Sequence, residues 1–97
     1  MSSFYVISTQ NKSGKNKYKL GRHTGSEKLL RSRYRTYLIN PVIFYFGRVI
    51  NPIIIEANMF DALKDFIIYD ENGIKTEWVC LELYKIIQDV IIISVSV

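Results

Sequence analysis

The sequence predicts a single α+β domain in which a small β-sheet is covered by helices. The chain has 97 residues, which is enough for one hydrophobic core and leaves no room for a second domain. Its composition, 48% hydrophobic and 13% aromatic with 2 prolines, is that of a folded protein. Strand-like and helix-like segments follow one another in the order β, β, α, β, α, turn, α, which is typical of the α+β class.

The first third of the chain predicts a β-hairpin. Residues 4–9, FYVIST, are mainly β-branched and aromatic. Residues 18–22, YKLGR, alternate between apolar and polar side chains, as strands do. Between them, residues 10–17, QNKSGKNK, are polar and basic, as expected for a loop. We therefore expect two antiparallel strands joined by a long, positively charged tip.

A helix is expected after the hairpin, with Thr24 or Ser26 as its N-cap. At about 100° per residue, residues 29–38 place their apolar side chains on one broad face: Leu29, Leu30, Tyr34, Tyr37 and Leu38. On this wheel Arg33 lies at the margin of the apolar face, whereas Arg31 and Arg35 point away from it.

The next segments predict a strand and a helix. Residues 42–46, VIFYF, are apolar at odd and even positions alike, so both faces of the expected strand are apolar. This favours a central strand covered on both faces, which residues 47–50 continue. From about residue 54 to 67 the apolar side chains have helical spacing.

The last quarter of the chain leaves two alternatives open. After a turn at residues 70–73, the segment 77–79 is either a brief strand or an extended connection. A last helix is expected over about residues 81–90. The uncharged tail, residues 91–97, is either a further strand or the edge of a longer parent protein.

Several classes of protein are disfavoured. A single cysteine, Cys80, excludes an internal disulfide, and no Cys/His cluster has the spacing of a zinc site. The first ten residues lack the pattern of a signal peptide, and no apolar stretch is long enough to span a membrane. We expect an intracellular protein without membrane contact, in the cytoplasm or nucleus of a host cell if the protein is viral.

Charge is distributed unevenly along the chain. Residues 1–50 hold ten Lys or Arg and one acid, a net charge of +9, while residues 51–97 hold three and eight, a net charge of −5. A basic half of this kind suits a phosphate-binding surface. The alternative is ordinary solvated charge.

Three short motifs, in this order and spacing, resemble the GIY-YIG nuclease superfamily. They are FYV at residues 4–6, KLG at residues 19–21 and an arginine on the following helix. The sequence is most similar to the branch of phage and large-virus proteins, in which the second motif reads K-I-G-R and a late E-W-F motif follows, here EWV at residues 77–79. The resemblance covers about residues 4–90. It implies a three-stranded antiparallel sheet flanked by helices, and a metal-dependent endonuclease that hydrolyses DNA.

The resemblance also implies roles for individual residues. Tyr5 would lie near the water or hydroxide that attacks phosphorus, and Lys19 occupies the position of the second motif's tyrosine. Gly21 would let the backbone pass close to a neighbour or substrate. For the helical arginine that clamps the phosphoryl group, Arg33 is preferred to Arg31 because it is closer to the sheet.

The family's metal-binding glutamate is assigned to Glu56. On a helical wheel its carboxylate falls inside the apolar stripe of its helix, and a buried carboxylate needs a partner. That partner is either Mg²⁺, or another divalent cation, or Arg33. The alternative is an acid stabilised by the first turn of a helix.

The remaining polar residues of the basic half have less specific roles. His23 is a candidate proton carrier or phosphate contact, with a bystander histidine as the alternative. Phosphate contacts are expected from Arg22, Arg31 and Arg35. Two rival functions remain, a nucleic-acid-binding or interaction module that has lost catalysis and a small structural viral protein. A sequence-reading domain, fused or separate, is a further expected partner.

Overall fold

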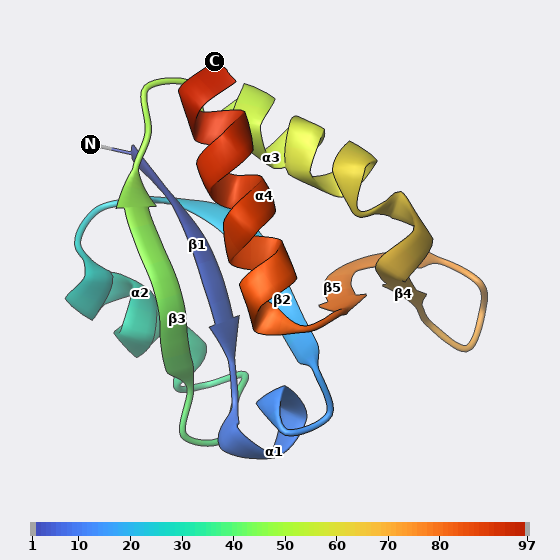
Figure 1. The fold of residues 1–97 in the computed structure, drawn as a ribbon. Helices are drawn as coiled ribbons and strands as arrows, with labels where there is room; N and C mark the ends of the chain where they lie inside the picture. Colours follow the sequence, from blue (N-terminus) through green and yellow to red (C-terminus); the bar gives the residue numbers. More distant parts are fainter. Residues whose placement is uncertain (1, 97) are drawn as a thin grey trace.

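The computed structural model describes residues 2–96 and contains one five-stranded antiparallel sheet (Figure 1). The strands lie in the order β3-β1-β2-β5-β4. Their bounds are Ser2–Ser8 (β1), Lys17–Thr24 (β2), Val42–Arg48 (β3), Ile67–Tyr69 (β4) and Lys75–Cys80 (β5). The α+β class is therefore correct, but the predicted three-stranded sheet is wrong, because β4 and β5 extend the sheet beyond β2.

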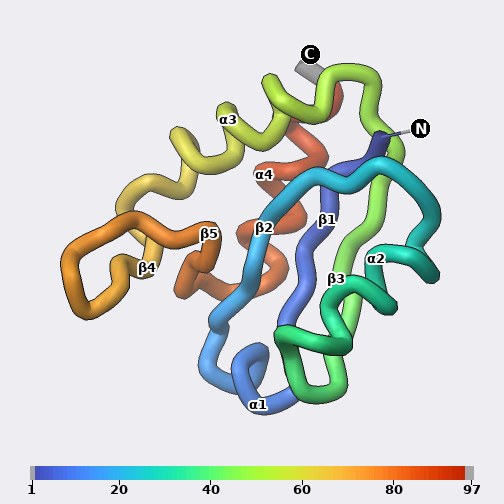
Figure 2. The backbone as a smooth tube through the Cα atoms, turned by 180° about the vertical axis from the view of Figure 1, so that it is seen from behind, coloured from blue at the N-terminus to red at the C-terminus, as the bar shows by residue number. Residues whose placement is uncertain are grey.

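Helices cover both faces of the sheet (Figures 1 and 2). The helices are Gln10–Ser13 (α1), Glu27–Tyr34 (α2), Pro52–Ala62 (α3) and Leu83–Ser96 (α4), with a 3₁₀ turn at Lys64–Phe66. Helix α2 packs beside β3, while α3 and α4 contact each other on the opposite face. The hairpin β4–β5 projects to one side of this body.

Strand β1 divides the core into two clusters because its side chains alternate between the faces. Phe4 and Val6 pack with α3 and α4, in a cluster that includes Ile55, Met59 and Ile86. On the opposite face, the α2 cluster consists of Tyr5, Ile7, Leu30 and Tyr34. The apolar face predicted over residues 29–38 is thus only partly buried, since Leu29 and Tyr37 are exposed and α2 ends at Tyr34.

Strand β3 is an edge strand, not the predicted central one. It pairs with β1 only, and its apolar side chains are half-buried because helices lie over both faces at this edge. The central position between β2 and β3 belongs to β1.

The predicted helix over residues 54–67 is too long. Helix α3 begins at Pro52, a favoured first residue, and ends at Ala62. The apolar spacing nevertheless continues through the break, because Leu63, between α3 and the 3₁₀ turn, and Ile67, in β4, join the same core.

The structure corrects one further prediction and decides between the alternatives left open at two other segments. The expected loop after β1 contains the single-turn helix α1, whose first turn is capped by the Thr9 hydroxyl accepting from the Lys12 amide at 3.0 Å. The segment 77–79 belongs to strand β5. The last helix runs past residue 90, and most of the tail therefore belongs to α4, with residue 97 outside the described range. Residues 2–96 contain no helix long and apolar enough to cross a membrane.

The sheet splits between β2 and β5. Only Lys17, Tyr18 and Lys19 of β2 pair with β5, at Cys80, Val79 and Trp78. Beyond this point Gly21–Thr24 pairs only with β1 within the described chain, which leaves that edge of β2 open toward α3.

Candidate functional site

A concave pocket of about 750 Å³ lies where β2 separates from β5, and we call it the site pocket. Six predicted residues line it: Tyr5 from β1, Gly21, Arg22 and His23 from β2, Arg33 from α2 and Glu56 from α3. Glu77 from β5 completes the wall. The site pocket is thus assembled from both faces of the sheet, since α2 and α3 lie on opposite sides of it.

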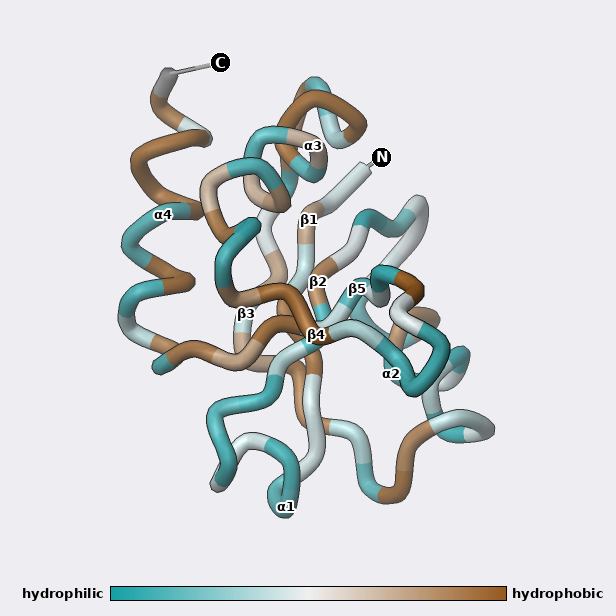
Figure 3. Tube along the Cα trace, turned by 90° about the vertical axis from the view of Figure 1, so that its right-hand side faces the viewer, coloured by the Kyte–Doolittle hydropathy of each residue, from teal (hydrophilic) through white to brown (hydrophobic). Residues whose placement is uncertain are grey.

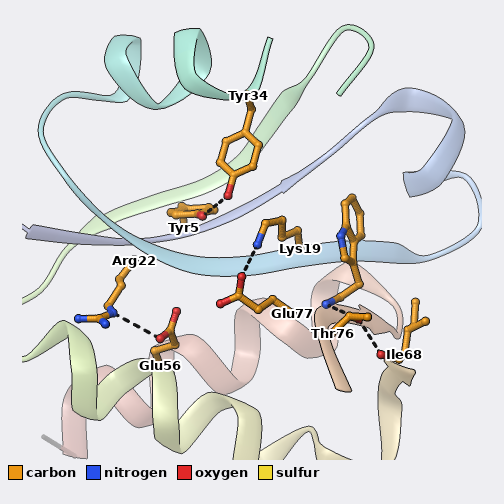
Figure 4. Close-up of polar contacts among 9 residues, drawn as sticks. Tyr5, Lys19, Arg22, Tyr34, Glu56, Ile68, Thr76 and Glu77 are labelled. Atoms are coloured by element: carbon orange, nitrogen blue, oxygen red, sulfur yellow. Dashed lines mark hydrogen bonds and ion pairs between the residues drawn. The ribbon is translucent and has the colours of Figure 1, made fainter. Parts of the chain in front are cut away.

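Tyr5 is buried at the floor of the site pocket, with 2% of its surface exposed. Its hydroxyl lies 2.6 Å from the hydroxyl of Tyr34 on α2, and the two rings meet edge to face (Figure 4). Burial raises the pKa of the Tyr5 phenol well above its usual range, and the hydrogen bond with Tyr34 raises that pKa further. Tyr5 is therefore a neutral hydrogen-bonding phenol at physiological pH.

Gly21 makes room for this phenol. It pairs with Tyr5 across the β1–β2 ladder, and the Tyr5 ring lies over its backbone. A Cβ at position 21 would come within 2.5 Å of the Tyr5 Cζ, closer than any real contact. The glycine thus permits a close approach between two strands, as the sequence predicted, with Tyr5 as the neighbour.

Arg33 is exposed at the rim of the site pocket. Its guanidinium lies 5.4 Å from the centre of the Tyr34 ring, and no carboxylate among residues 2–96 forms an ion pair with it. Arg31 lies elsewhere on α2 and pairs with Glu27 at 3.3 Å. Arg31 and Arg35 line a different hollow, next to the residues that follow α2.

Glu56 points into the site pocket from α3, and 20% of its side chain is exposed (Figure 4). Its Oε1 lies 3.4 Å from Nε of Arg22, so the ion-pair partner of Glu56 is Arg22 and not Arg33, which was one of the two alternatives. Burial raises the pKa of the Glu56 carboxyl, repulsion from Glu77 raises it further, and Arg22 and Lys19 offset part of this rise.

Glu77 is held by a salt bridge to Lys19. The Lys19 Nζ lies 2.6 Å from Glu77 Oε1, and only 15% of the lysine side chain is exposed (Figure 4). The ammonium group is also 5.8 Å from the Tyr34 ring. Lys19 therefore fixes a carboxylate in the site pocket.

Two carboxylates, those of Glu56 and Glu77, line the site pocket, and each is paired with a cationic side chain, Arg22 and Lys19 respectively. Residues 2–96 contain no group of three His, Cys, Asp or Glu able to hold a metal by themselves. Mg²⁺ is commonly bound through one or two carboxylates together with waters and substrate phosphates. Glu56 and Glu77 line the same pocket and repel each other, and a cation between them would relieve this repulsion.

His23 lines the site pocket from the end of β2. Its ring tilts against Phe46 at 6.4 Å, and its buried Nε2 has no hydrogen-bond partner in the described chain. Gly25, at a φ of 126°, leaves space for this ring, since a Cβ there would lie 3.2 Å from Nε2. The histidine therefore belongs to the wall of the pocket.

Two residues of the site were not assigned their roles from the sequence. Tyr34 was placed in the core as an apolar side chain, and its hydroxyl contact with Tyr5 joins residues 29 positions apart. Glu77 stands out in the sequence only as part of the EWV motif, and its salt bridge with Lys19 spans 58 positions. The local sequence offers one indication that Tyr34 belongs to the site, namely its position next to Arg33.

Comparisons with known proteins give relatives but no family. The chain is 34% identical over 84 residues to uncharacterized protein R10 of Acanthamoeba polyphaga mimivirus, and 33% identical over 84 residues to uncharacterized protein R9 of the same virus. Each match covers 87% of this chain and 22% of the relative, so the chain spans about a fifth of the length of these viral proteins. No family model and no solved structure matches the chain.

Proposed function

We propose that this protein is a metal-dependent endonuclease of the GIY-YIG type that hydrolyses phosphodiester bonds of DNA. The proposal is supported chiefly by one observation. Tyr5, Arg33 and Glu56 come from three separate elements and line one concave pocket. The likeness to large-virus nucleases in the sequence motifs agrees with the viral origin of the relatives.

Several side chains of the site pocket would each have a separate role in the proposed hydrolysis. The Arg33 guanidinium, which has no carboxylate partner among residues 2–96, donates to the phosphoryl oxygens as negative charge develops on them. The neutral Tyr5 hydroxyl, oriented by Tyr34, hydrogen-bonds to the attacking water or to a phosphate oxygen. Arg22 contacts a phosphate beside Glu56.

Glu56, with Glu77 beside it, would hold the divalent cation. A bound Mg²⁺ would supply positive charge to the phosphodiester and lower the pKa of a coordinated water. Because DNA is the substrate, we place the protein inside a cell, and a fused or separate domain would select the DNA sequence.

The test is the nicking of supercoiled plasmid in the presence of Mg²⁺. Arg33→Ala should lower the rate by about 10² to 10³-fold, the usual loss when one group that stabilises a transition-state oxyanion is removed. Glu56→Gln should abolish nicking, as should a chelator. The matched control is Arg31→Ala on the same helix, which should leave the rate unchanged because Arg31 does not line the site pocket and is paired with Glu27. Equal loss in both arginine variants would contradict the proposal.

Metal binding has a readout that does not depend on activity. Mg²⁺ should raise the melting temperature of the wild-type protein and leave that of Glu56→Gln unchanged, because binding to the folded state stabilises it.

A nucleic-acid-binding module without catalysis is the second candidate. Two contacts favour this candidate, because they occupy groups that catalysis would use. Lys19 is paired with Glu77, and the Tyr5 hydroxyl is hydrogen-bonded to Tyr34. Binding that weakens with salt while plasmid stays intact in Mg²⁺ would identify this alternative.

A further inference from the structure

Two further hollows continue from the site pocket along α2 and toward α1. The first, of about 370 Å³, is lined by Lys19, Arg33, Tyr34, Tyr37, Leu38 and Trp78, and we call it the aromatic hollow. The second, of about 650 Å³, includes Lys12, Lys15 and Lys17 in its lining and is called the lysine hollow.

Shared residues show that the three hollows adjoin one another. Arg33 lines both the site pocket and the aromatic hollow, while Tyr37 and Leu38 line both the aromatic hollow and the lysine hollow. We call the aromatic and lysine hollows together the strand groove. Helix α1, which contributes Lys12 to this groove, is hydrophilic (Figure 3).

Aromatic rings are presented openly in the strand groove. Tyr37 is 75% exposed and meets the Tyr34 ring edge to face at 6.2 Å. Trp78 on β5 is half-buried, and the Lys12 ammonium lies 5.2 Å from the centre of its ring. Because the face of an exposed ring is free to stack, Tyr37 offers a platform for a planar group.

Cations line the same groove without acids. Five lysine and arginine side chains contribute to its two hollows: Lys12, Lys15, Lys17, Lys19 and Arg33. Neither lining contains an Asp or Glu. Lys19 is paired with Glu77, which lines neither hollow.

We propose that the strand groove binds unpaired DNA that leads into the site pocket. The lysines contact successive phosphates, and a base stacks on Tyr37 beside Trp78. Single-stranded nucleic acids are bound in this way, by a basic groove with aromatic platforms, because every base has a stacking face. Paired bases keep their faces inside the duplex, so stacking requires a strand that is open next to the cleavage point.

This inference deepens the proposed function and rests on it, because the groove leads to the pocket in which cleavage is proposed. It names the substrate class as DNA with a single-stranded segment adjoining the scissile bond. The lysine hollow then holds the strand that extends away from that bond.

The binding test uses the fluorescence of Trp78, the single tryptophan of the chain. A short oligothymidylate should quench this fluorescence and bind more tightly than a duplex. It should also bind more tightly than an abasic strand of the same length, which keeps the phosphates and lacks the bases.

Variants assign the stacking to one ring. Tyr37→Ala should weaken binding of the oligothymidylate by about fivefold to 150-fold, which corresponds to the loss of one base stack. Tyr37→Phe keeps the ring and should bind as the wild type does. Tyr69→Ala removes another exposed tyrosine, 56% exposed on β4 and outside the groove, and is the matched control. Because Tyr37 is exposed, none of these changes disturbs the core.

The outcomes separate the two proposals. Equal affinity for single strand, duplex and abasic strand would overturn the strand groove, as would equal binding by Tyr37→Ala and Tyr69→Ala. If the oligothymidylate binds as expected but no DNA carrying a single-stranded flap is cut in Mg²⁺, the groove stands and the endonuclease fails. If duplex is cut as fast as the flap and Tyr37→Ala cuts both normally, the endonuclease stands and the groove fails.

Discussion

The Glu56 carboxylate lies in a position that costs stability. Burial and the neighbouring Glu77 raise the pKa of this carboxyl, and the salt bridge with Arg22 compensates only in part. The ionised form of Glu56 is therefore less stable in the folded protein than in the unfolded chain. This is common for ionisable groups at functional sites.

A pH-dependent stability follows from the direction of this shift. The folded pKa lies above the ordinary value of 4.5, so between the two pKa values the folded state binds more protons than the unfolded state. The free energy of unfolding should therefore fall as pH rises through this window, and stay lower at neutral pH. Glu56→Gln should be more stable than the wild type in urea at pH 7, with the difference vanishing in acid.

The control for this prediction is Glu82→Gln, which removes an exposed carboxylate paired with Lys85 at 3.6 Å. Exposed pairs of this kind contribute little, so its stability should follow the wild type at every pH. A neutral-pH loss of stability in Glu56→Gln would mean that Arg22 holds the carboxylate favourably.

Single residues were predictable where the signal was local. Helical spacing placed Arg33 at the edge of the buried face of α2, and it lies at the rim of the site pocket. The Tyr5–Tyr34 and Lys19–Glu77 contacts depend on how distant elements come together. No pattern within one segment encodes them.

At the level of elements, the hairpin β4–β5 carries Glu77 and Trp78 to two different hollows. Successive residues of a strand face opposite ways, so the register of β5 decides which side chain enters which hollow. Thr76 fixes this hairpin, because its Oγ1 donates to the Ile68 carbonyl at 2.6 Å and accepts from the Trp78 amide at 3.2 Å (Figure 4).

Thr76→Val should therefore loosen the hairpin. Valine keeps the shape but removes both hydrogen bonds, so we expect a loss of about 1 to 2 kcal/mol in the free energy of unfolding. Faster hydrogen exchange at the β4 and β5 amides should accompany it. Thr36→Val is the control, since the exposed Thr36 hydroxyl makes only one bond, of 3.1 Å, to the Arg33 carbonyl. Equal losses in the two variants would exclude a special role for Thr76.

Elements were predictable where their ends carry chemical signals. Ser26 caps α2 by accepting from the Leu29 amide at 3.2 Å, and this helix begins close to where the sequence placed it. Strand β4 was missed because Ile67 keeps the four-residue spacing of Ile55, Met59 and Leu63. The helical spacing of apolar residues therefore continues past Leu63, although the helix itself ends there.

The tail was undecided for a related reason. Its β-branched residues favour a strand locally, but Ile93 continues the stripe of Ile86 and Val90 that packs on the core. Tertiary packing decides in favour of α4, whose last turns are strongly apolar (Figure 3).

For the whole molecule, the uneven charge of the sequence becomes a spatial arrangement. The lysines of the hairpin tip, Arg22 of β2 and Arg33 of α2 come together along the strand groove and the site pocket. The order of strand-like and helix-like segments predicted the class of the fold, while the number of strands depended on β4 and β5, which this order did not include.

Salt dependence tests this arrangement. For single strands the logarithm of the binding constant should fall with the logarithm of salt by about 0.7 per phosphate contact. Lys15→Ala should make this slope shallower by about that amount, since Lys15 lines the lysine hollow. Lys85→Ala on α4, paired with Glu82, should leave the slope unchanged. The same slope in all three proteins would remove Lys15 from the DNA contacts.

The contact between Tyr5 and Gly21 also limits how this sequence can change over generations. A side chain at position 21 fits only after residue 5 has lost its large ring, since the two occupy the same space. The order of substitutions is therefore fixed, with position 5 first. A lineage that keeps an aromatic ring at position 5 should retain glycine at position 21, whereas one that has abandoned Tyr5 is free to vary both.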